Sequence, residues 1–275
     1  MIYKCIRCDG SLNLQMSCQI CGKQYSADDK GVISMLPFLN LEKKKNSELY
    51  DALNRKKNKN EYSRFSTYLN YGLLKEKQRY EGKHNTSINL ILSICKIVNF
   101  TGKKVIDIGC GRGGNLFYIN SCFDTDILVG IDLSYQNILF CKSKEEKINF
   151  IQADAEKLPF GDMTFDVVLN IESALHYPNV ERFYLEVERI LEKNGVFIYV
   201  DIIEKNECQI RKKRLVDIGF DFMCECDYTD DVLRAIKANK ENDIDDKMPL
   251  FDHSKMYWEL YERKKKYILW IMKKK

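Results

Sequence analysis

The sequence has few of the residues that interrupt regular structure, and it has no long apolar run. Only 4 Pro and 14 Gly occur among its 275 residues, which argues against a collagen-like or low-complexity chain. The longest apolar stretch, residues 88–100, is interrupted by Lys96 and by Asn and Ser residues. It falls well short of the roughly 20 apolar residues that a membrane-spanning helix needs. The sequence therefore predicts a globular protein without a membrane span.

A strong excess of charge of one sign is also missing. Against 44 Lys+Arg stand 40 Asp+Glu, and a net charge of +4 is too small to require a polyanionic partner. With 45% hydrophobic residues, the chain has enough apolar material for one main domain and a small accessory unit. The first ten residues, MIYKCIRCDG, lack the apolar core of a secretory signal peptide, so a cytoplasmic location is expected.

Cysteine, by contrast, is abundant, and four of the 11 Cys form two pairs near the start of the chain. Cys5-x2-Cys8 and Cys18-x2-Cys21 are separated by nine residues, and each pair can present two thiolates from one turn. Together they predict a tetrahedral zinc site with no open position, so the metal is expected to be structural. In isolated finger peptides such a metal contributes roughly 10 to 16 kcal/mol to folding. The other seven Cys are interpreted as small buried hydrophobes.

Beyond residue 100, short β-rich runs alternate with helical stretches. The predicted strands are 104–108, 127–131, 148–152, 165–171 and 196–202, and the helical stretches between them are 115–122, 134–147 and 180–193. Gly195 is expected to end the last of these helices. Weaker signals give strands at 220–227 and 267–273 and helices at 230–239 and 254–263. This order predicts an α/β fold with a parallel sheet, helices on both faces, and a ligand crevice at the carboxyl ends of the strands.

A glycine-rich segment, VIDIGCGRGG at residues 105–114, ends the first of these strands and opens a helix. Its glycines allow a tight turn and a close approach of the backbone to a cofactor. The spacing of Gly109, Gly111 and Gly114 also satisfies a dinucleotide-binding fingerprint. The glycines alone therefore do not separate a nicotinamide enzyme from an S-adenosylmethionine enzyme.

Three acidic residues at successive strand ends make that distinction. Asp107 lies just before the first glycine, where a pyrophosphate gains nothing from a negative charge but an ammonium group does. Asp132 ends the second strand, where a carboxylate can accept both hydroxyls of a ribose, and Asp154 follows the third, where it can accept from an adenine amino group. Each alone could cap a helix. Together they match one ligand with three donor groups.

Residues 101–202 resemble a class I S-adenosylmethionine-dependent methyltransferase in VIDIGCGRGG, GIDLS, ADAEKLPFGDMTFDVVLNIES and LEVERILEKNGVFIYVDI. The resemblance implies a Rossmann-like sheet with flanking helices, beside the small N-terminal zinc ribbon. It also implies S-adenosylmethionine as the cofactor. Asp107 would bind its methionine end, Asp132 its ribose and Asp154 its adenine. The positions expected at the cofactor are Asp107, Gly109, Cys110, Gly111, Asp132, Leu133, Asp154, Ala155, Asn170 and Tyr71.

The predicted organisation has three parts: a zinc ribbon at 1–38, a helical linker or lid at 39–84, and the methyltransferase domain at 85–275. The run YSADDKGVISMLP, residues 25–37, also resembles zinc-ribbon modules that are fused to methyltransferases. In this family an N-terminal helical stretch commonly folds over the cofactor, so Tyr68 and Tyr71 are interpreted as part of a lid. The alternative is that these rings only dock the linker on the sheet.

The segment NIESALHYP, residues 170–178, is expected to face the transferable methyl group. It lacks the Asn/Asp-Pro-Pro-Tyr/Phe element usual in methyltransferases that act on base amino groups, and it offers Glu172, His176 and Tyr177 instead. An imidazole with an ordinary pKa near 6.5 suits removal of a hydroxyl proton at neutral pH. His176 is therefore the first candidate base, with a packing role as the alternative.

From about residue 65 onward the chain most resembles bacterial small-molecule O-methyltransferases that act on polyketide-derived lipids and other secondary metabolites. Relatives often carry His where Leu175 stands. The resemblance implies a small-molecule acceptor methylated on a hydroxyl oxygen, with nitrogen and carbon acceptors still open.

Two other functions remain as alternatives. Basic clusters at 43–45, 55–57, 211–214 and 263–266, together with a zinc ribbon, would suit a methyltransferase acting on bases of ribosomal or transfer RNA. A non-catalytic module whose ribbon recruits a carrier or partner protein is a third class, and the three acids argue against it. A ribbon that binds such a partner beside a catalytic domain is compatible with the main hypothesis.

Overall fold

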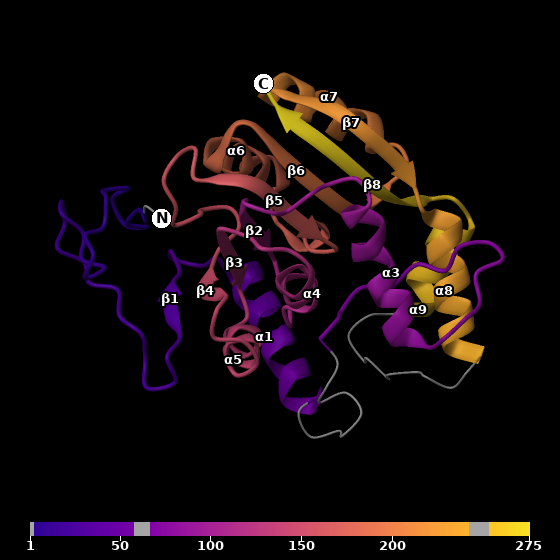
Figure 1. Cartoon of the computed structure of the whole chain (residues 1–275), viewed down its shortest axis with the longest axis horizontal. Helices are drawn as coiled ribbons and strands as arrows, with labels where there is room; N and C mark the ends of the chain where they lie inside the picture. Colours follow the sequence, from indigo (N-terminus) through magenta and orange to yellow (C-terminus); the bar gives the residue numbers. More distant parts are fainter. Residues whose placement is uncertain (1–2, 58–66, 242–252) are drawn as a thin grey trace.

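The computed structural model describes residues 3–57, 67–241 and 253–275, and an eight-stranded sheet runs through them (Figure 1). The strands lie in the order β1-β4-β3-β2-β5-β6-β8-β7. Their bounds are β1 (Ile33–Met35), β2 (Lys104–Ile108), β3 (Ile127–Asp132), β4 (Asn149–Ala153), β5 (Phe165–Ile171), β6 (Leu191–Glu204), β7 (Phe220–Asp227) and β8 (Lys265–Lys274).

The sheet is mixed, and the expectation of a parallel sheet is wrong at one edge. Strands β1 to β6 pair in parallel, whereas β8 is antiparallel to both of its neighbours, β6 and β7. After β7 the chain forms two helices at the carboxyl edge of the sheet, and β8 starts at that same edge, with Lys265 opposite Glu204. The final strand must therefore run back along β6.

Helices cover both faces of the sheet, as the alternating pattern predicted. They are α1 (Leu41–Lys57), α3 (Lys83–Cys95), α4 (Gly114–Cys122), α5 (Tyr135–Lys142), α6 (Val180–Ile190), α7 (Cys208–Ile218), α8 (Thr229–Glu241) and α9 (His253–Tyr261), with a 3-10 turn η1 (Ala174–His176). Buried side chains of α6 and α7 belong to the core on one face, and those of α3, α4, α5, α8 and α9 to the core on the other. None of the described helices is long and apolar enough to span a membrane.

Two of the predicted helix ends are wrong. Helix α5 ends at Lys142, short of residue 147. Helix α6 ends at Ile190, because Leu191 is extended, fully buried and paired with Phe165 at the start of β6. The chain then turns through Asn194, whose φ is 65°, before pairing with β5 resumes at Val196. Gly195 consequently lies within β6 and does not end the helix.

Residues 3–40, called the N-terminal segment below, are built onto the edge of the sheet. Strand β1 pairs in parallel with β4, with Met35 opposite Ala153. Cys5, Tyr25 and Met35 lie in the same hydrophobic core as the inner side chains of β3 and β4. Strand β1 also pairs with an edge of β4 that would otherwise expose unsatisfied backbone groups. The segment thus shares the core of the sheet, although the three-part division of the chain stays a prediction.

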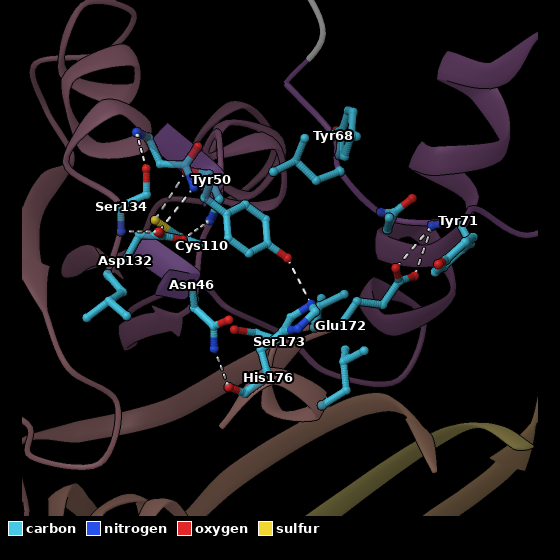
Figure 2. A pocket seen from close by; sticks show the side chains of 18 of the residues that line it. Asn46, Tyr50, Tyr68, Tyr71, Cys110, Asp132, Ser134, Glu172, Ser173 and His176 are labelled. Carbon is cyan, nitrogen blue, oxygen red and sulfur yellow. Dashed lines mark hydrogen bonds between the residues drawn. The ribbon is translucent and has the colours of Figure 1, made fainter. Parts of the chain in front are cut away.

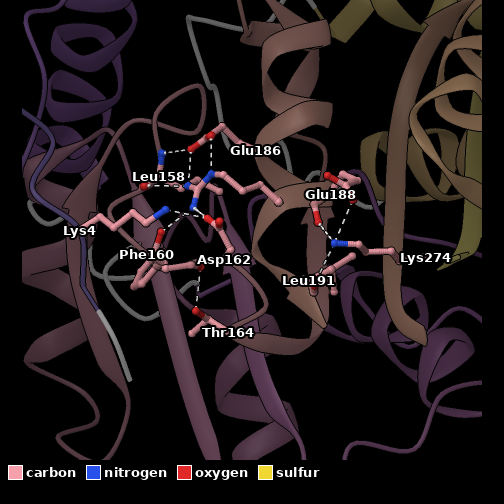
Figure 3. A network of polar contacts seen from close by, with 11 residues as sticks. Lys4, Leu158, Phe160, Asp162, Thr164, Glu186, Glu188, Leu191 and Lys274 are labelled. Carbon is pink, nitrogen blue, oxygen red and sulfur yellow. Dashed lines mark hydrogen bonds and ion pairs between the residues drawn. The ribbon is translucent and has the colours of Figure 1, made fainter. Parts of the chain in front are cut away.

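A polar network secures the other end of the N-terminal segment (Figure 3). The Lys4 ammonium donates to Asp162 at 2.7 Å, and Arg189 of α6 donates to the same carboxylate at 2.9 Å. These two cations lower the pKa of Asp162. Arg189 also donates to the carbonyl of Phe160 at 2.7 Å and pairs with Glu186. The segment is therefore attached to the sheet at β1 and near its first residues.

Candidate functional site

A cavity of about 480 Å³ opens at the carboxyl ends of β2, β3, β4 and β5. Segments from five parts of the chain line it: α1, residues 67–71, the loops after the four strands, the end of α8, and α9. Among the predicted cofactor positions, the cavity is lined by Gly109, Cys110, Gly111, Asp132, Leu133, Asp154, Ala155 and Tyr71. The other two positions, Asp107 and Asn170, are fully buried.

The glycine loop between β2 and α4 requires glycine on steric grounds. Gly109 has a φ of 76°, and a Cβ there would lie 1.9 Å from Ser173 Oγ. The amide groups of Gly109 and Cys110 donate to the carbonyl of Ile131 at 2.8 and 2.9 Å, which fixes the loop against β3. The backbone can thus approach a cofactor without a side chain in between.

Three buried side-chain oxygens near this loop lack a hydrogen-bond donor among the described residues: Asp107 Oδ1, Asn115 Oδ1 and Asn170 Oδ1. Asp107 is fully buried, which raises the pKa of its carboxyl group to about 7, and Asn115 donates weakly to its other oxygen at 3.4 Å. Buried acceptors normally have donors. An ammonium group carries three donors, so the methionine end of S-adenosylmethionine fits this set.

Asp132 lies at the end of β3 with its carboxylate oriented by the loops around it. It accepts hydrogen bonds from the amides of Gly111 and Ser134 at 2.8 Å, and from Asn137 Nδ2 at 3.1 Å. Burial raises the pKa of Asp132 to about 6 despite these hydrogen bonds, which act in the opposite direction. The carboxylate is held rigidly at the cavity wall, the position predicted to bind ribose hydroxyls.

Asp154, just beyond β4, forms an ion pair that the sequence did not reveal. Its Oδ2 accepts from the Lys43 ammonium of α1 at 2.7 Å, and Lys43 also lies 2.7 Å from Glu156 Oε2. The sequence analysis considered Lys43 only as part of the basic cluster at residues 43–45. The two partners are 111 residues apart, so no local pattern connects them.

Helix α1 also lines the cavity, through Lys43, Asn46, Ser47 and Tyr50; Figure 2 shows Asn46 and Tyr50 beside His176. Ser47 donates to the carbonyl of Leu133 at 3.1 Å, and Asp51 accepts from Ser134 Oγ at 2.5 Å. Tyr50 directs its hydroxyl into the cavity toward His176. Part of the segment predicted as a lid, residues 58–66, lies outside the described residues. Tyr68 and Tyr71 follow it and line the cavity.

Glu172 directly follows β5 and has an unusual backbone for a residue with a side chain, with a φ of 50°. Such conformations occur often at functional sites. Its carboxyl group accepts from the Tyr71 amide at 3.0 Å and from the Tyr267 hydroxyl at 2.5 Å. Burial raises the pKa of Glu172 to about 8. The group can therefore exchange a proton close to neutral pH.

His176, at the end of η1, also lines the cavity, but its environment disfavours the charged form. Its Nε2 lies 2.9 Å from the Tyr50 hydroxyl oxygen, and burial lowers the pKa of the imidazole to about 4. The ring is neutral at pH 7, and its basicity is well below that of an ordinary histidine. Asn46 Nδ2 donates to the His176 carbonyl at 3.1 Å, which links η1 to α1.

Tyr177, the third catalytic candidate, is tied into the base of the cavity. Its hydroxyl oxygen lies 2.8 Å from Ser173 Oγ and accepts from Asn170 Nδ2 at 3.0 Å. Burial raises the pKa of Tyr177 far above its ordinary value, so the phenol stays protonated. These contacts hold the segment from Asn170 to Tyr177 in place beneath Gly109.

The far part of the cavity is formed by residues that the sequence analysis did not single out. Ile236 and Lys237 of α8, and Tyr257 and Trp258 of α9, line it. These helices lie at the end of the sheet opposite the N-terminal segment (Figure 1). Apolar and aromatic side chains with a few polar groups are typical of small-molecule sites. No local sequence signal placed α8 and α9 beside the glycine loop.

The four cysteines of the N-terminal segment converge as their spacing predicted. The sulfur atoms of Cys5, Cys8, Cys18 and Cys21 all lie within 4.8 Å of one another. Amides of Ile20 and Cys21 donate to Cys18 Sγ at 3.4 and 3.5 Å, and such contacts favour a thiolate. A four-sulfur set of this kind fits a tetrahedral metal ion such as zinc.

Comparison with known proteins shows that part of the chain is similar to methyltransferases. Residues 106–199 match the family model described as "Methyltransferase domain". The chain is 33% identical over 169 residues to the phthiotriol/phenolphthiotriol dimycocerosates methyltransferase of Mycobacterium tuberculosis, over 60% of this chain and 63% of that protein. It is 33% identical over 155 residues to the fatty-acid O-methyltransferase of Mycolicibacterium smegmatis, over 56% and 57% of the two chains. The matches span less than two thirds of these relatives.

Solved structures share the fold. Geranyl diphosphate C-methyltransferase from Streptomyces coelicolor superposes with a TM-score of 0.69 at 12% identity, over 86% of this chain and 98% of that one. The cyclase SpnF superposes with a TM-score of 0.67 at 17% identity, over 86% and 97%. These structures share the fold of this chain, and residues 106–199 resemble a methyltransferase domain, as do the matched parts of the lipid and fatty-acid methyltransferases.

Proposed function

We propose that this chain transfers the methyl group of S-adenosylmethionine to a hydroxyl oxygen of a small, largely apolar acceptor. The observation that carries the proposal is the single cavity in which Asp132 and Asp154, at successive strand ends, meet Glu172 and the aromatic residues of α9. The buried, unpaired oxygen of Asp107 lies at the same edge of the sheet. One end of the cavity thus suits the cofactor, and the other suits an acceptor.

The residues of the chain take three parts in the proposed reaction. Asp107, Asp132 and Asp154 hold the cofactor, which supplies an electrophilic methyl group when it is bound. Helix α1 and residues 67–71 exclude water and orient both ligands, and positioning of this kind can contribute roughly 7 to 11 kcal/mol. The proton of the acceptor hydroxyl passes to the carboxylate of Glu172.

Glu172 suits the role of base better than His176. A general base works best when its pKa lies near the operating pH. The pKa of Glu172, raised to about 8, meets this condition, whereas the pKa of His176, lowered to about 4, makes the imidazole a weak proton acceptor. In this assignment His176 and Tyr50 form the wall beside the acceptor, and Tyr177 holds the loop.

The charges on the surface favour a small acceptor over RNA. Many residues of the basic clusters are already paired with acids: Lys43 with Asp154 and Glu156, Arg211 with Glu207, Lys212 with Glu225, Arg214 with Glu181, Arg263 with Asp230, Lys264 with Glu262, Lys265 with Glu259, and Lys266 with Asp227. Phosphate binding would have to compete with these contacts. The names of the relatives, which describe lipid and fatty-acid methyltransferases, point the same way.

We also propose that Cys5, Cys8, Cys18 and Cys21 bind one structural zinc ion. The convergence of the four sulfur atoms supports this proposal. Metal analysis of the purified protein should give one zinc per chain, and Cys18→Ser should lower that content. A protein purified without metal that still folds and melts normally would contradict a structural role.

Methyl transfer from labelled S-adenosylmethionine tests the main proposal. The purified protein is incubated with an extract of the source cells, and label is then measured in an organic-soluble fraction and in a purified RNA fraction. Label in the organic fraction supports the proposal and yields the product for identification of the methylated atom. Label in RNA, or in neither fraction although S-adenosylhomocysteine binds, would contradict it.

A further inference from the structure

Three charged side chains meet at the adenine end of the proposed cofactor site. The Lys43 ammonium lies 2.7 Å from Asp154 Oδ2 and 2.7 Å from Glu156 Oε2. The three side chains are only 11%, 7% and 8% exposed, so solvent screens this group far less than it screens an ion pair on the surface. The arrangement places one cation between two carboxylates, beside the cavity.

The two carboxylates accept the same number of hydrogen bonds but differ in their access to the cavity. Glu156 accepts from Lys43 and, through its other oxygen, from the amide of Asn179 at 2.9 Å, which ties it to the start of α6. Asp154 accepts from Lys43 through Oδ2 and from the Glu156 amide through Oδ1 at 2.9 Å. Each carboxylate oxygen can accept two hydrogen bonds. Both carboxylates can therefore accept a further hydrogen bond, but only Asp154 lines the cavity and can accept one from a ligand there.

Lys43 is itself held firmly from two sides. Its amide donates to Asn40 Oδ1 at 2.9 Å, which caps the first turn of α1. One turn further on, Ser47 donates to the carbonyl of Leu133. Only residues 36–40 connect β1 to α1, and Met35 of β1 lies opposite Ala153, next to Asp154. The position of Lys43 is thus set by the same edge of the sheet that carries Asp154.

We propose that Lys43 is a positioning residue for adenine recognition: it holds the Asp154 carboxylate in the orientation that accepts from the adenine 6-amino group. This inference rests on the proposed function, because it requires the cavity to bind S-adenosylmethionine. Without the ammonium group, Asp154 and Glu156 repel each other. Asp154 then turns away from the cavity, and the selectivity for the 6-amino group is lost.

Calorimetric titration with two ligands tests the proposal without any need for the acceptor. The ligands are S-adenosylhomocysteine and its 6-deamino analogue, in which hydrogen replaces the adenine amino group. We expect the unmodified protein to bind the analogue roughly 10- to 100-fold more weakly, as for the loss of one hydrogen bond to a charged group. In Lys43→Met this ratio should fall to about threefold or less, while Lys43→Arg should keep most of it.

The matched control is Lys45→Met, on the same helix, because the Lys45 side chain is exposed and has no hydrogen bond or ion pair among the described residues. It should leave both dissociation constants unchanged. If Lys43→Met proves unstable by circular dichroism, Lys43→Gln replaces it, since Gln keeps a donor but carries no charge.

Each other outcome contradicts a distinct claim. If Lys43→Met weakens the binding of both ligands by the same factor, then Lys43 only attaches α1 to the sheet. The proposed positioning role is then wrong. If the unmodified protein binds both ligands equally, Asp154 does not recognise the amino group, and the inference fails together with the adenine assignment. If the unmodified protein binds neither ligand, the proposed function itself fails.

Discussion

The two walls of the cavity are built in different ways. The sheet wall carries its acids at the ends of β2, β3 and β4, and the backbone hydrogen bonds between these strands fix the spacing of the acids. The other wall, α1, is joined to the rest by side chains: Lys43 to Asp154, Ser47 to Leu133, and Tyr50 to His176. Backbone pairing therefore fixes the sheet wall, whereas the place of the α1 wall depends on a few side-chain contacts.

The largest expected effect lies at the sheet wall. Glu172→Gln should lower the rate of methyl transfer roughly 100-fold or more, the usual contribution of a general base, and should leave the dissociation constant of S-adenosylhomocysteine within about twofold. In the unmodified protein the rate should rise with pH and level off above about pH 8, because Glu172 must be ionised and its pKa is raised to about 8. The pH profile of Glu172→Gln should lack this rise.

His176→Gln is the matched comparison. It should cost less than about tenfold in rate if Glu172 is the base. A loss in His176→Gln that equals or exceeds the loss in Glu172→Gln would reverse the assignment.

Asp132→Ala should weaken S-adenosylhomocysteine binding by about 100-fold, because two ribose hydroxyls lose a charged acceptor. Titration calorimetry measures this directly. The paired variant is Asp51→Ala on α1, which removes a carboxylate that contacts Ser134 but does not line the cavity. It should weaken S-adenosylhomocysteine binding by less than about fivefold. An equal loss of S-adenosylhomocysteine affinity in the two variants would contradict the proposed difference between the two walls.

Removal of the metal should act on the cofactor through α1. The cysteines hold the N-terminal segment, β1 pairs with β4, and α1 starts after residues 36–40. Chelation, or Cys18→Ser, should therefore weaken S-adenosylhomocysteine binding by roughly tenfold. By linkage, S-adenosylhomocysteine should raise the affinity for the metal by the same factor, measured by equilibrium competition with a chelator.

Cys122→Ser is the control for the metal experiment, because Cys122 lies outside the four-cysteine cluster and is exposed, so its interpretation as a buried residue is wrong. It should affect neither cofactor binding nor metal content. Equal cofactor affinity with and without metal would show that the N-terminal segment and the cavity are independent.

The smallest expected effect comes from Tyr50→Phe, which removes the hydroxyl that contacts His176. With Glu172 as base, the rate should fall by no more than about fivefold, and the free energy of unfolding should fall by about 1 kcal/mol for one lost hydrogen bond. Rate measurement and urea unfolding check the two numbers. A loss in rate as large as that of Glu172→Gln would place the chemistry at Tyr50 and His176.

Local patterns predicted much of the fold. The runs at 104–108 and 165–171 are strands β2 and β5 with the predicted bounds, because a buried parallel strand needs a continuous apolar run. The predictions failed where a local signal competed with pairing elsewhere. Gly195 looked like a helix end, but Leu191 pairs with Phe165 on the neighbouring strand. Strand β1 was missed because its three residues are too few to show a period.

The sequence by itself determined the groups that we propose to hold a methyl donor and a metal: the glycines whose positive φ the loop requires, the acids that follow each strand, and the paired cysteines. These are local features, set by backbone conformation and short spacing. Only the tertiary structure decided which residues from distant parts of the chain contact the acids of the site. Tyr267 contacts Glu172 across 95 residues and Lys43 contacts Asp154 across 111. These contacts, and the burial that raises the pKa of Glu172, come from the packing of distant segments, and neither depends on any sequence period.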